Sequence, residues 1–381
     1  MNLNTLYELL HNSLEKFSDK VAFSMFGSED VTYSEVGRRV EQVQEMLLDA
    51  GLVAGDKVAL LSSSMPNWGV CYMAVVTAGM VAVPIMNDFT SAELDLLINH
   101  SEAKALLVSD KLFTKLSKDV VAKLNIVIRT KNFSVVSQMV TGAGEAIVPK
   151  PEDLAVIIYT SGTTSKPKGV MLTHGNLAQQ INMIYRLYPI GVEDSMLSVL
   201  PLSHTYECSL GMLYVFAYLE KPPTPSILLP ALRKVRPTCF LIVPLIIEKI
   251  YNSQIVAKFT SNKFIKSIYG VGCFRKLLHR IAGKKLNQAF GGKARLFIGG
   301  AKLDERVEQF LVEAKIPYAI GYGLTETAPL VAGQISPATK VGATGPQMNG
   351  VKVRLDNVNP ETGHGEIVVN SPSVMQGYFG V

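Results

Sequence analysis

Residues 58–87 read VALLSSSMPNWGVCYMAVVTAGMVAVPIMN, and no side chain in this stretch is charged. Its apolar ends predict buried strands over VALLSSS and VAVPIM, with a helix over WGVCYMAVVTAG between them. A membrane-spanning helix needs about 20 continuous apolar residues, whereas Ser62–Ser64, Pro66 and Asn67 interrupt this run. We therefore expect a strand–helix–strand unit buried in a parallel sheet, and not a membrane span.

The same alternation of strand and helix patterns continues over most of the chain. Thr32 and Thr90 each precede a Glu by three residues, a spacing that is typical of a capping box, and Gly51 is a natural C-terminal cap for the first of these helices. Further strands are expected at 105–109, 125–129, 154–160, 195–201, 239–243, 295–300 and 318–323, and further helices at 176–188, 210–219 and 304–314. This alternation predicts an α/β fold with two helix-covered, mostly parallel sheets.

From Pro337 onward the pattern changes. Two short strand patterns, VKVRL and GEIVVN, are joined by the turn-rich segment NVNPETGHG with no helix between them. Such a pattern predicts a hairpin, so we expect a small β subdomain at this end of the chain.

The composition is that of a globular protein. The chain has 381 residues, of which 48% are hydrophobic and 18% charged, against a typical charged share of about 25%. Disordered, collagen-like and coiled-coil classes are excluded. The length suits two or three subdomains better than one compact core.

The net charge of +5 is concentrated in one segment. Residues 251–295 contain ten Lys and Arg and no Asp or Glu, so the rest of the chain is net acidic. We interpret this segment as a solvated helix surface and retain peripheral contact with an anionic membrane as the alternative; no nucleic-acid partner is predicted. The four cysteines are scattered without metal-binding spacing, and the N-terminus has no signal-peptide pattern. Both features favour a cytoplasmic protein.

The segment most informative about chemistry is IIYTSGTTSKPKGVMLTH, residues 157–174. A buried strand opens there into a run of hydroxyl side chains, two glycines and two lysines. Glycines let backbone N–H groups approach an anion, while hydroxyls and lysines add donors and charge, so the segment predicts polyphosphate binding. It is not a Walker A loop, because Lys168 precedes Gly169 and no Ser or Thr follows. The alternative is a flexible polar surface loop.

This segment closely resembles the phosphate loop of adenylate-forming enzymes, which include acyl-CoA synthetases, luciferases and peptide-synthetase adenylation domains. The resemblance continues in order through LPLSHTYE (200–207), FIGGAKL (297–303), GYGLTETAP (321–329) and the segments of 341–380. It covers nearly the whole chain. It implies the fold of the large N-terminal domain of acyl-CoA synthetases, with a first α/β subdomain at about 14–200, a second at 201–335 and the start of the small β subdomain at 336–381.

The resemblance implies a ligase that uses ATP and Mg²⁺ to convert a carboxylic acid into an acyl-adenylate with release of pyrophosphate. CoA would then take the acyl group. The form of LPLSHTYE is similar to that of long-chain fatty acyl-CoA synthetases, so a fatty acid is the expected substrate. The alternatives are an aromatic acid, a carrier-protein acceptor, and a non-catalytic module that binds nucleotide and acyl groups.

Roles for individual residues follow from the same resemblance. The β- and γ-phosphates would be held by Thr160, Ser161, Gly162, Thr163, Thr164 and Lys168. Adenine and the acyl carbonyl would lie along Gly299, Gly300 and Ala301, with the Gly321–Tyr322–Gly323 segment presenting the Tyr322 ring to adenine. Glu326 would hold Mg²⁺, Thr325 would contact the α-phosphate, and His204 would border the carboxylate. The expected catalytic residues are Thr164, Lys168, His204, Thr325 and Glu326.

Each of these roles has an ordinary alternative. Tyr322 alone would suggest core packing, Gly299–Gly300 a turn, and His204 a hydrogen-bonded structural residue. His174 is interpreted as part of a helix start rather than a catalyst. The family also has a ribose-binding Asp, a hinge and a mobile C-terminal domain with a catalytic Lys, and none lies within 1–381. We therefore expect this chain to retain the ATP and acyl pockets, with severely reduced adenylation.

Overall fold

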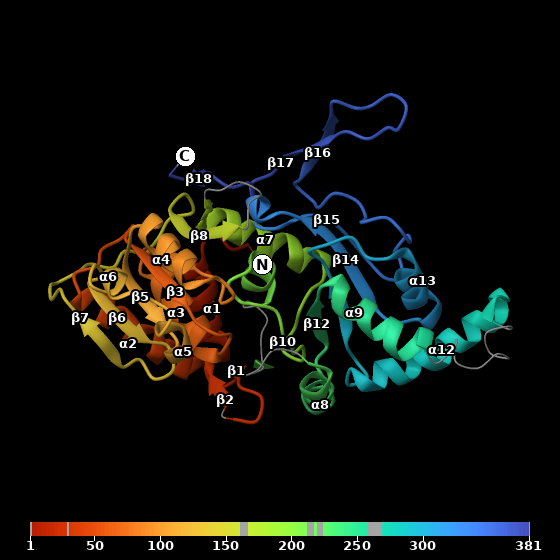
Figure 1. The fold of residues 1–381 in the computed structure, drawn as a ribbon, viewed down its shortest axis with the longest axis horizontal. Helices are drawn as coiled ribbons and strands as arrows, with labels where there is room; N and C mark the ends of the chain where they lie inside the picture. The colour runs from red at the N-terminus through yellow and green to blue at the C-terminus, as the bar shows by residue number, and fades with distance from the viewer. Residues whose placement is uncertain are drawn as a thin grey trace.

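A computed structural model describes residues 2–28, 30–160, 167–211, 217–218, 224–257 and 269–380 of the chain. In Figure 1 the chain forms two lobes side by side, each built on its own sheet, and α7 (His174–Leu187) lies between them. The predicted α/β fold with two helix-covered, mostly parallel sheets is confirmed. No helix in the described ranges is long and apolar enough to cross a bilayer.

The first sheet has the strand order β18-β9-β8-β4-β3-β5-β6-β7 in the described residues. Its strands are β3 (Lys57–Leu61), β4 (Val81–Pro84), β5 (Ala103–Val108), β6 (Ile126–Arg129), β7 (Val135–Gln138), β8 (Leu154–Thr160), β9 (Lys168–Thr173) and β18 (Gly377–Phe379). The neighbours from β8 to β6 pair in parallel, whereas β7, β9 and β18 pair antiparallel. Antiparallel strands thus extend a parallel centre at both edges.

Helices cover both faces of this sheet because its central strands are apolar on both sides. One face carries α1 (Leu6–Phe17), α2 (Tyr33–Asp49), α3 (Pro66–Thr77) and α7. The other carries α4 (Ser91–His100), α5 (Asp110–Phe113) and α6 (Lys118–Val121). Every residue of α3 is buried, so the uncharged stretch 58–87 forms the buried strand–helix–strand unit that its sequence predicts.

The second sheet has the order β12-β13-β14-β15, with β12, β13 and β14 parallel and β15 antiparallel. Its strands are β12 (Cys239–Ile242), β13 (Arg295–Ile298), β14 (Tyr318–Gly323) and β15 (Leu330–Ile335). Its core contains side chains from α8 (Pro225–Val235), α9 (Pro244–Ile250), the π-helical turn η2 (Tyr251–Val256), α12 (Gly272–Ala289) and α13 (Glu305–Ala314).

Three two-stranded ribbons complete the described structure. They are β1 (Val21–Ser24) with β2 (Asp30–Thr32), β10 (Leu197–Ser198) with β11 (Ala217–Tyr218), and β16 (Lys352–Asp356) with β17 (Glu366–Asn370). The β16–β17 ribbon is the predicted hairpin, but the chain then returns to the first sheet through β18. The division at 14–200, 201–335 and 336–381 remains our proposal for the subdomains, with 377–379 adding a strand to the first sheet.

Two predicted elements differ from the structure. We expected the loop after β8 to lead directly into a helix, but 168–173 form β9, which pairs antiparallel with β8. β8 and β9 are therefore neighbouring antiparallel strands, because the apolar VMLT run forms a strand before α7 begins. Of the helix expected over 210–219, residues 212–216 and 219 lie outside the described residues. Residues 210–211 end the π-helical turn η1 (Glu207–Gly211), and 217–218 form β11.

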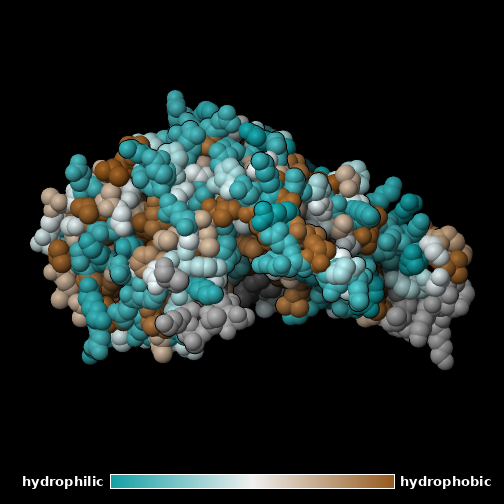
Figure 2. Space-filling model, turned by 90° about the horizontal axis from the view of Figure 1, so that it is seen from above, coloured by the Kyte–Doolittle hydropathy of each residue, from teal (hydrophilic) through white to brown (hydrophobic). Residues whose placement is uncertain are grey.

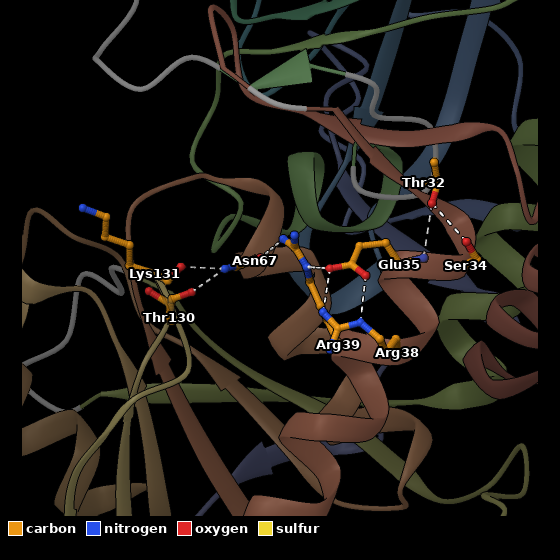
Figure 3. A network of polar contacts seen from close by, with 8 residues as sticks. All are labelled: Thr32, Ser34, Glu35, Arg38, Arg39, Asn67, Thr130 and Lys131. Atoms are coloured by element: carbon orange, nitrogen blue, oxygen red, sulfur yellow. Dashed lines mark hydrogen bonds and ion pairs between the residues drawn. The ribbon is translucent and has the colours of Figure 1, made fainter.

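The capping box predicted at Thr32 forms only in part. The Thr32 hydroxyl accepts the Glu35 N–H at 3.3 Å, but the Glu35 carboxylate binds Arg38 and Arg39 instead of returning to the Thr32 N–H. Arg39 also donates to Asn67 of α3, which joins the two helices (Figure 3). The arginines, Arg38 first, lower the pKa of Glu35 to about 2. At Thr90 both halves of the predicted capping box are present.

Helix α7 holds three separated segments through buried polar side chains. Asn182 bonds the backbone N–H and C=O of Leu3, and Asn176 donates to the carbonyls of Pro372 and Val374. Gln180 donates to the carbonyls of Thr327 and Leu330 in the second lobe. The N-terminal segment, the 371–374 segment and the turn before β15 are therefore fixed to one helix.

We predict that Gln180→Ala lowers the free energy of unfolding by about 2–3 kcal/mol, because the buried carbonyl of Thr327 and the partly buried carbonyl of Leu330 lose this donor. Urea unfolding followed by circular dichroism measures this. Gln138→Ala is the matched control, since the Gln138 side chain is exposed and should shift stability by no more than about 0.5 kcal/mol. Equal effects of the two variants would contradict the role given to Gln180.

Candidate functional site

A pocket of about 310 Å³ lies where the carboxyl ends of β13 and β14 meet the last turn of α7 and the 204–206 segment. Ligands of open α/β sheets bind at this end of the strands. The pocket brings together nine of the residues singled out from the sequence, which come from four separate segments. They are Thr160, His204, Gly299, Gly300, Gly321, Tyr322, Gly323, Thr325 and Glu326.

The glycines at the end of β14 are required by packing. A Cβ on Gly321 would lie 2.7 Å from the Leu330 side chain, and a Cβ on Gly323 would lie 1.8 Å from the Pro329 carbonyl oxygen. Only glycine lets β14 approach β15 this closely. Tyr322 stands between them in the pocket wall, and the short helix η3 (Thr325–Thr327) follows directly.

The second glycine pair lies after β13. Gly300 has a φ of +89°, a conformation that glycine adopts without strain, and a Cβ on Gly299 would lie 3.3 Å from the Tyr206 ring. The bare backbone of Gly299 and Gly300 therefore forms part of the pocket surface. Ala301, which follows, is exposed and does not line the pocket.

Glu326 is connected to the base of the predicted phosphate loop through one aromatic ring. The Tyr378 hydroxyl donates to Glu326 Oε1 at 2.9 Å, and this bond raises the pKa of Tyr378. The Lys168 ammonium lies 5.5 Å from the centre of the same ring, within cation–π range. Lys168 does not itself line the pocket, but β18 fixes Tyr378 between it and Glu326. Residues 161–166, with Ser161, Gly162, Thr163 and Thr164, lie outside the described residues.

His204 stands on the side of the pocket next to Tyr206. Its Nδ1 accepts the Tyr206 backbone N–H at 3.2 Å, which leaves the proton of the neutral ring on Nε2. Desolvation by the surrounding wall lowers the pKa of His204, so the ring is neutral at pH 7. His174, in contrast, is the buried first residue of α7 and accepts the Leu6 N–H, as its interpretation as a helix-start residue requires.

Sequence reasoning missed the apolar wall that α7 contributes. Ile184, Leu187 and Tyr188 line the pocket, and the Tyr188 ring lies edge-on to Phe297 at 5.2 Å. Their spacing of three and four residues marks one helix face, but nothing in that pattern separates a pocket wall from ordinary core. Tyr378 was also missed, because its partner Glu326 lies 52 positions away in the sequence.

The described residues contain no cluster of three or more His, Cys, Asp or Glu that could hold a metal ion. Glu326 is the acidic side chain of the pocket lining, and one of its oxygens is already bonded to Tyr378. A single carboxylate suits Mg²⁺, which keeps several waters and takes its remaining ligands from phosphate oxygens. The donor set fits a metal that is held together with a polyphosphate, and not a closed protein site.

The sequence profile of the AMP-binding enzyme family matches residues 10–379. The chain belongs to the AMP-binding enzyme family. It is 26% identical to a chloroplastic long-chain-fatty-acid–[acyl-carrier-protein] ligase of Arabidopsis thaliana, over 98% of this chain and 63% of the relative. It is 27% identical to a long-chain-fatty-acid–CoA ligase of Mycobacterium bovis, over 92% and 64%. This chain thus spans less than two thirds of the length of either relative.

A solved structure of the o-succinylbenzoate CoA synthetase of Bacillus subtilis, in complex with an acyl-adenylate intermediate, has the same fold. Its TM-score is 0.77 at 19% identity, over 98% of this chain and 90% of that one. The likeness covers both lobes of this chain, so the two lobes are arranged as they are in that structure.

Glu207, directly behind the pocket residues Thr205 and Tyr206, is completely buried. The Ser198 hydroxyl donates to one of its carboxyl oxygens, and the other has no partner among the described residues. Burial raises the pKa of Glu207 to about 8. The folded protein therefore keeps this carboxyl protonated at pH 7. Burial of the Tyr218 side chain likewise raises the pKa of Tyr218.

We predict that Glu207→Gln removes part of the pH dependence of stability. As pH rises from about 4.5 to 8, the unfolded chain loses this proton while the folded chain keeps it, so the free energy of unfolding of the parent falls over this window. Glutamine has no proton to lose. The variant should therefore become more stable relative to the parent between pH 5 and pH 8, by a few kcal/mol at most. Urea titrations of both proteins at several pH values measure this, and parallel curves would refute it.

Proposed function

We propose that this chain is the large domain of an ATP-dependent acid–thiol ligase that activates a fatty acid as its acyl-adenylate. The observation that carries the proposal is the convergence of Thr160, His204, Gly299–Gly300, Gly321–Gly323 and Thr325–Glu326 on one pocket. The first three lie far from one another and from the 321–326 stretch in the sequence, and the fold brings all of them together. The membership of the AMP-binding family supports the nucleotide as the shared ligand.

In the proposed reaction, a carboxylate oxygen of the acid forms a bond to the α-phosphorus of ATP. The bond from that phosphorus to the bridging oxygen breaks, and pyrophosphate leaves with that oxygen. The sulfur of CoA then bonds to the acyl carbon as the thiol proton passes to solvent, the bond from that carbon to the phosphate oxygen breaks, and AMP leaves with that oxygen. The first step gains most from groups that hold two anions in line and neutralise the leaving pyrophosphate.

Thr160, Thr325 and Glu326 suit that task by their place in the pocket. We assign Thr160, Lys168 and the loop residues Ser161, Gly162, Thr163 and Thr164 to the phosphates, and Thr325 to the α-phosphate. The bare backbone of Gly299 and Gly300 suits the flat edge of adenine, and the Tyr322 ring suits its face. Glu326 would hold Mg²⁺, which supplies positive charge to the phosphates when bound. The neutral His204 ring can donate a hydrogen bond from its Nε2–H to the carboxylate of the acid.

The nature of the acid is the finer part of the proposal. The apolar wall of Ile184, Leu187 and Tyr188 favours an acyl or aryl group over a small polar acid. Both fatty-acid ligases among the relatives favour a long chain, whereas the o-succinylbenzoate synthetase is the precedent for an aromatic acid. CoA is our proposed acceptor, and a carrier protein is the alternative.

We predict that a non-hydrolysable palmitoyl-adenylate mimic binds this chain and that Tyr322→Ala weakens binding about tenfold or more, because stacking on a base contributes roughly 1–3 kcal/mol. Isothermal titration calorimetry gives both affinities. Phe274→Ala, which alters an exposed ring on α12, is the control and should leave the affinity unchanged. The same titration with a benzoyl-adenylate mimic distinguishes a fatty acid from an aromatic one.

Failure of the folded chain to bind either mimic would refute the adenylate pocket. Binding without any exchange of radiolabelled pyrophosphate into ATP, in this chain and in the full-length protein, would favour the non-catalytic binding module instead.

We also propose that this protein is cytoplasmic and contacts anionic membranes peripherally through α12. The observation behind this proposal is that Phe274, Leu277 and Ile281 are each about half exposed at helical spacing, beside several cations of the 251–295 segment. Flotation with phosphatidylglycerol vesicles should show binding that weakens as salt rises. Phe274→Glu should abolish it, and equal binding to neutral vesicles or to the variant would contradict it.

A further inference from the structure

A second and larger hollow, of about 640 Å³, lies on the outer side of the second lobe between α8, α9, η2 and α12. Its lining shares no residue with the candidate nucleotide pocket. We call it the α8–α12 groove. Its volume falls within the range of small-molecule sites, and the roles assigned to the pocket residues leave it unused.

Most of the side chains that line the groove are apolar, both on its floor and at its edge. Leu228, Ile255 and Leu286 form part of its lining and belong to the buried core of the second lobe. Leu245 and Ile281 continue the lining outward and are 58% and 51% exposed. Single exposed leucines are ordinary, but a continuous apolar hollow open to water marks a binding surface. Figure 2 shows apolar patches between hydrophilic ones on the half of the molecule that carries α9 and α12.

The charged side chains of the groove are all cationic. Arg233 of α8, Lys249 of α9 and Lys285 of α12 line it from three directions, and all three are exposed. No Asp or Glu belongs to the lining. Glu248, next to Lys249, is turned instead to the Asp304 N–H at 3.1 Å. No ion pair of the three cations is found in the described part of the chain.

From this combination we infer that the α8–α12 groove binds a free long-chain fatty acid, with the chain along the apolar lining and the carboxylate between Arg233, Lys249 and Lys285. A ligand that satisfies the groove must present both an apolar body and a negative charge. Guanidinium and ammonium groups bind carboxylates by charge-assisted hydrogen bonds, and burial of the chain supplies the larger part of the binding free energy. A concave site of this size suits one chain better than the flat surface of a bilayer does. This inference concerns binding and stands independently of the proposed adenylation.

The direct test is photolabelling of the intact chain with a diazirine analogue of palmitate, followed by peptide mapping. The inference predicts adducts in the 225–256 and 272–289 peptides, and competition by unlabelled palmitate. Adducts confined to peptides of the nucleotide pocket, around 184–206 and 297–333, would overturn it, as would no adduct at all. Saturation with the acyl-adenylate mimic should leave the groove adducts in place. Palmitate labelling of the groove and mimic binding in the nucleotide pocket are thus tested separately, and either can fail without the other.

Matched variants locate the site. Lys285→Glu places a carboxylate in the lining, whereas Lys284→Glu makes the same change on the neighbouring exposed position outside it. Leu245→Glu and Phe274→Glu form a second pair, of which only Leu245 lines the groove. We expect Lys285→Glu and Leu245→Glu to reduce groove labelling about fivefold or more, with melting temperatures and mimic binding near those of the parent.

The two control variants should label as the parent does. Equal labelling of all four variants would overturn the inference. The inference would also be overturned if Leu245→Glu abolished binding to phosphatidylglycerol vesicles but left palmitate labelling unchanged.

Discussion

The structure depends on the buried amide side chains of α7. Asn176, Gln180 and Asn182 lie on a helix packed against the first sheet, yet they bond the N-terminus, the 371–374 segment and the turn before β15. Buried backbone groups of irregular segments must find partners, and here one helix supplies them to three. The position of β15, and with it the Gly321–Glu326 wall of the pocket, is therefore tied to the first lobe through side-chain hydrogen bonds.

The same junction explains why the pocket lies between the lobes. β8 ends at Thr160 in the first sheet, β13 and β14 end at Ile298 and Gly323 in the second, and the last turn of α7 lies beside them. β18 crosses back from the second lobe to pair with β9, which places Tyr378 against Glu326. Glycine at 321 and 323 lets the strands close over this junction without a side chain in the way.

Much of this architecture could be predicted from the periodicity of apolar residues and from the positions of glycines, prolines and helix-capping residues. The 58–87 unit, the Thr90 capping box and the alternation of strands and helices are local signals, and the structure follows them. The Thr32 capping box failed in part because Arg38 and Arg39 compete for the Glu35 carboxylate. β9 was missed because its run KGVMLT is short and apolar, and periodicity alone does not separate such a strand from the start of the helix that follows. Site residues inside recognisable motifs could be named, but the α7 wall and the Tyr378–Glu326 bond depend on contacts between distant segments, which no local pattern encodes.

The central claim is that one pocket at the junction of the lobes takes an acyl-adenylate. The most direct measurement is a crystal structure of this chain with the palmitoyl-adenylate mimic. The account predicts the adenine ring against Tyr322 and the Gly299–Gly300 backbone, the phosphate mimic beside Thr325, and the acyl group along Ile184, Leu187 and Tyr188. A mimic bound at another surface, or one whose acyl group leaves that wall uncovered, would contradict it.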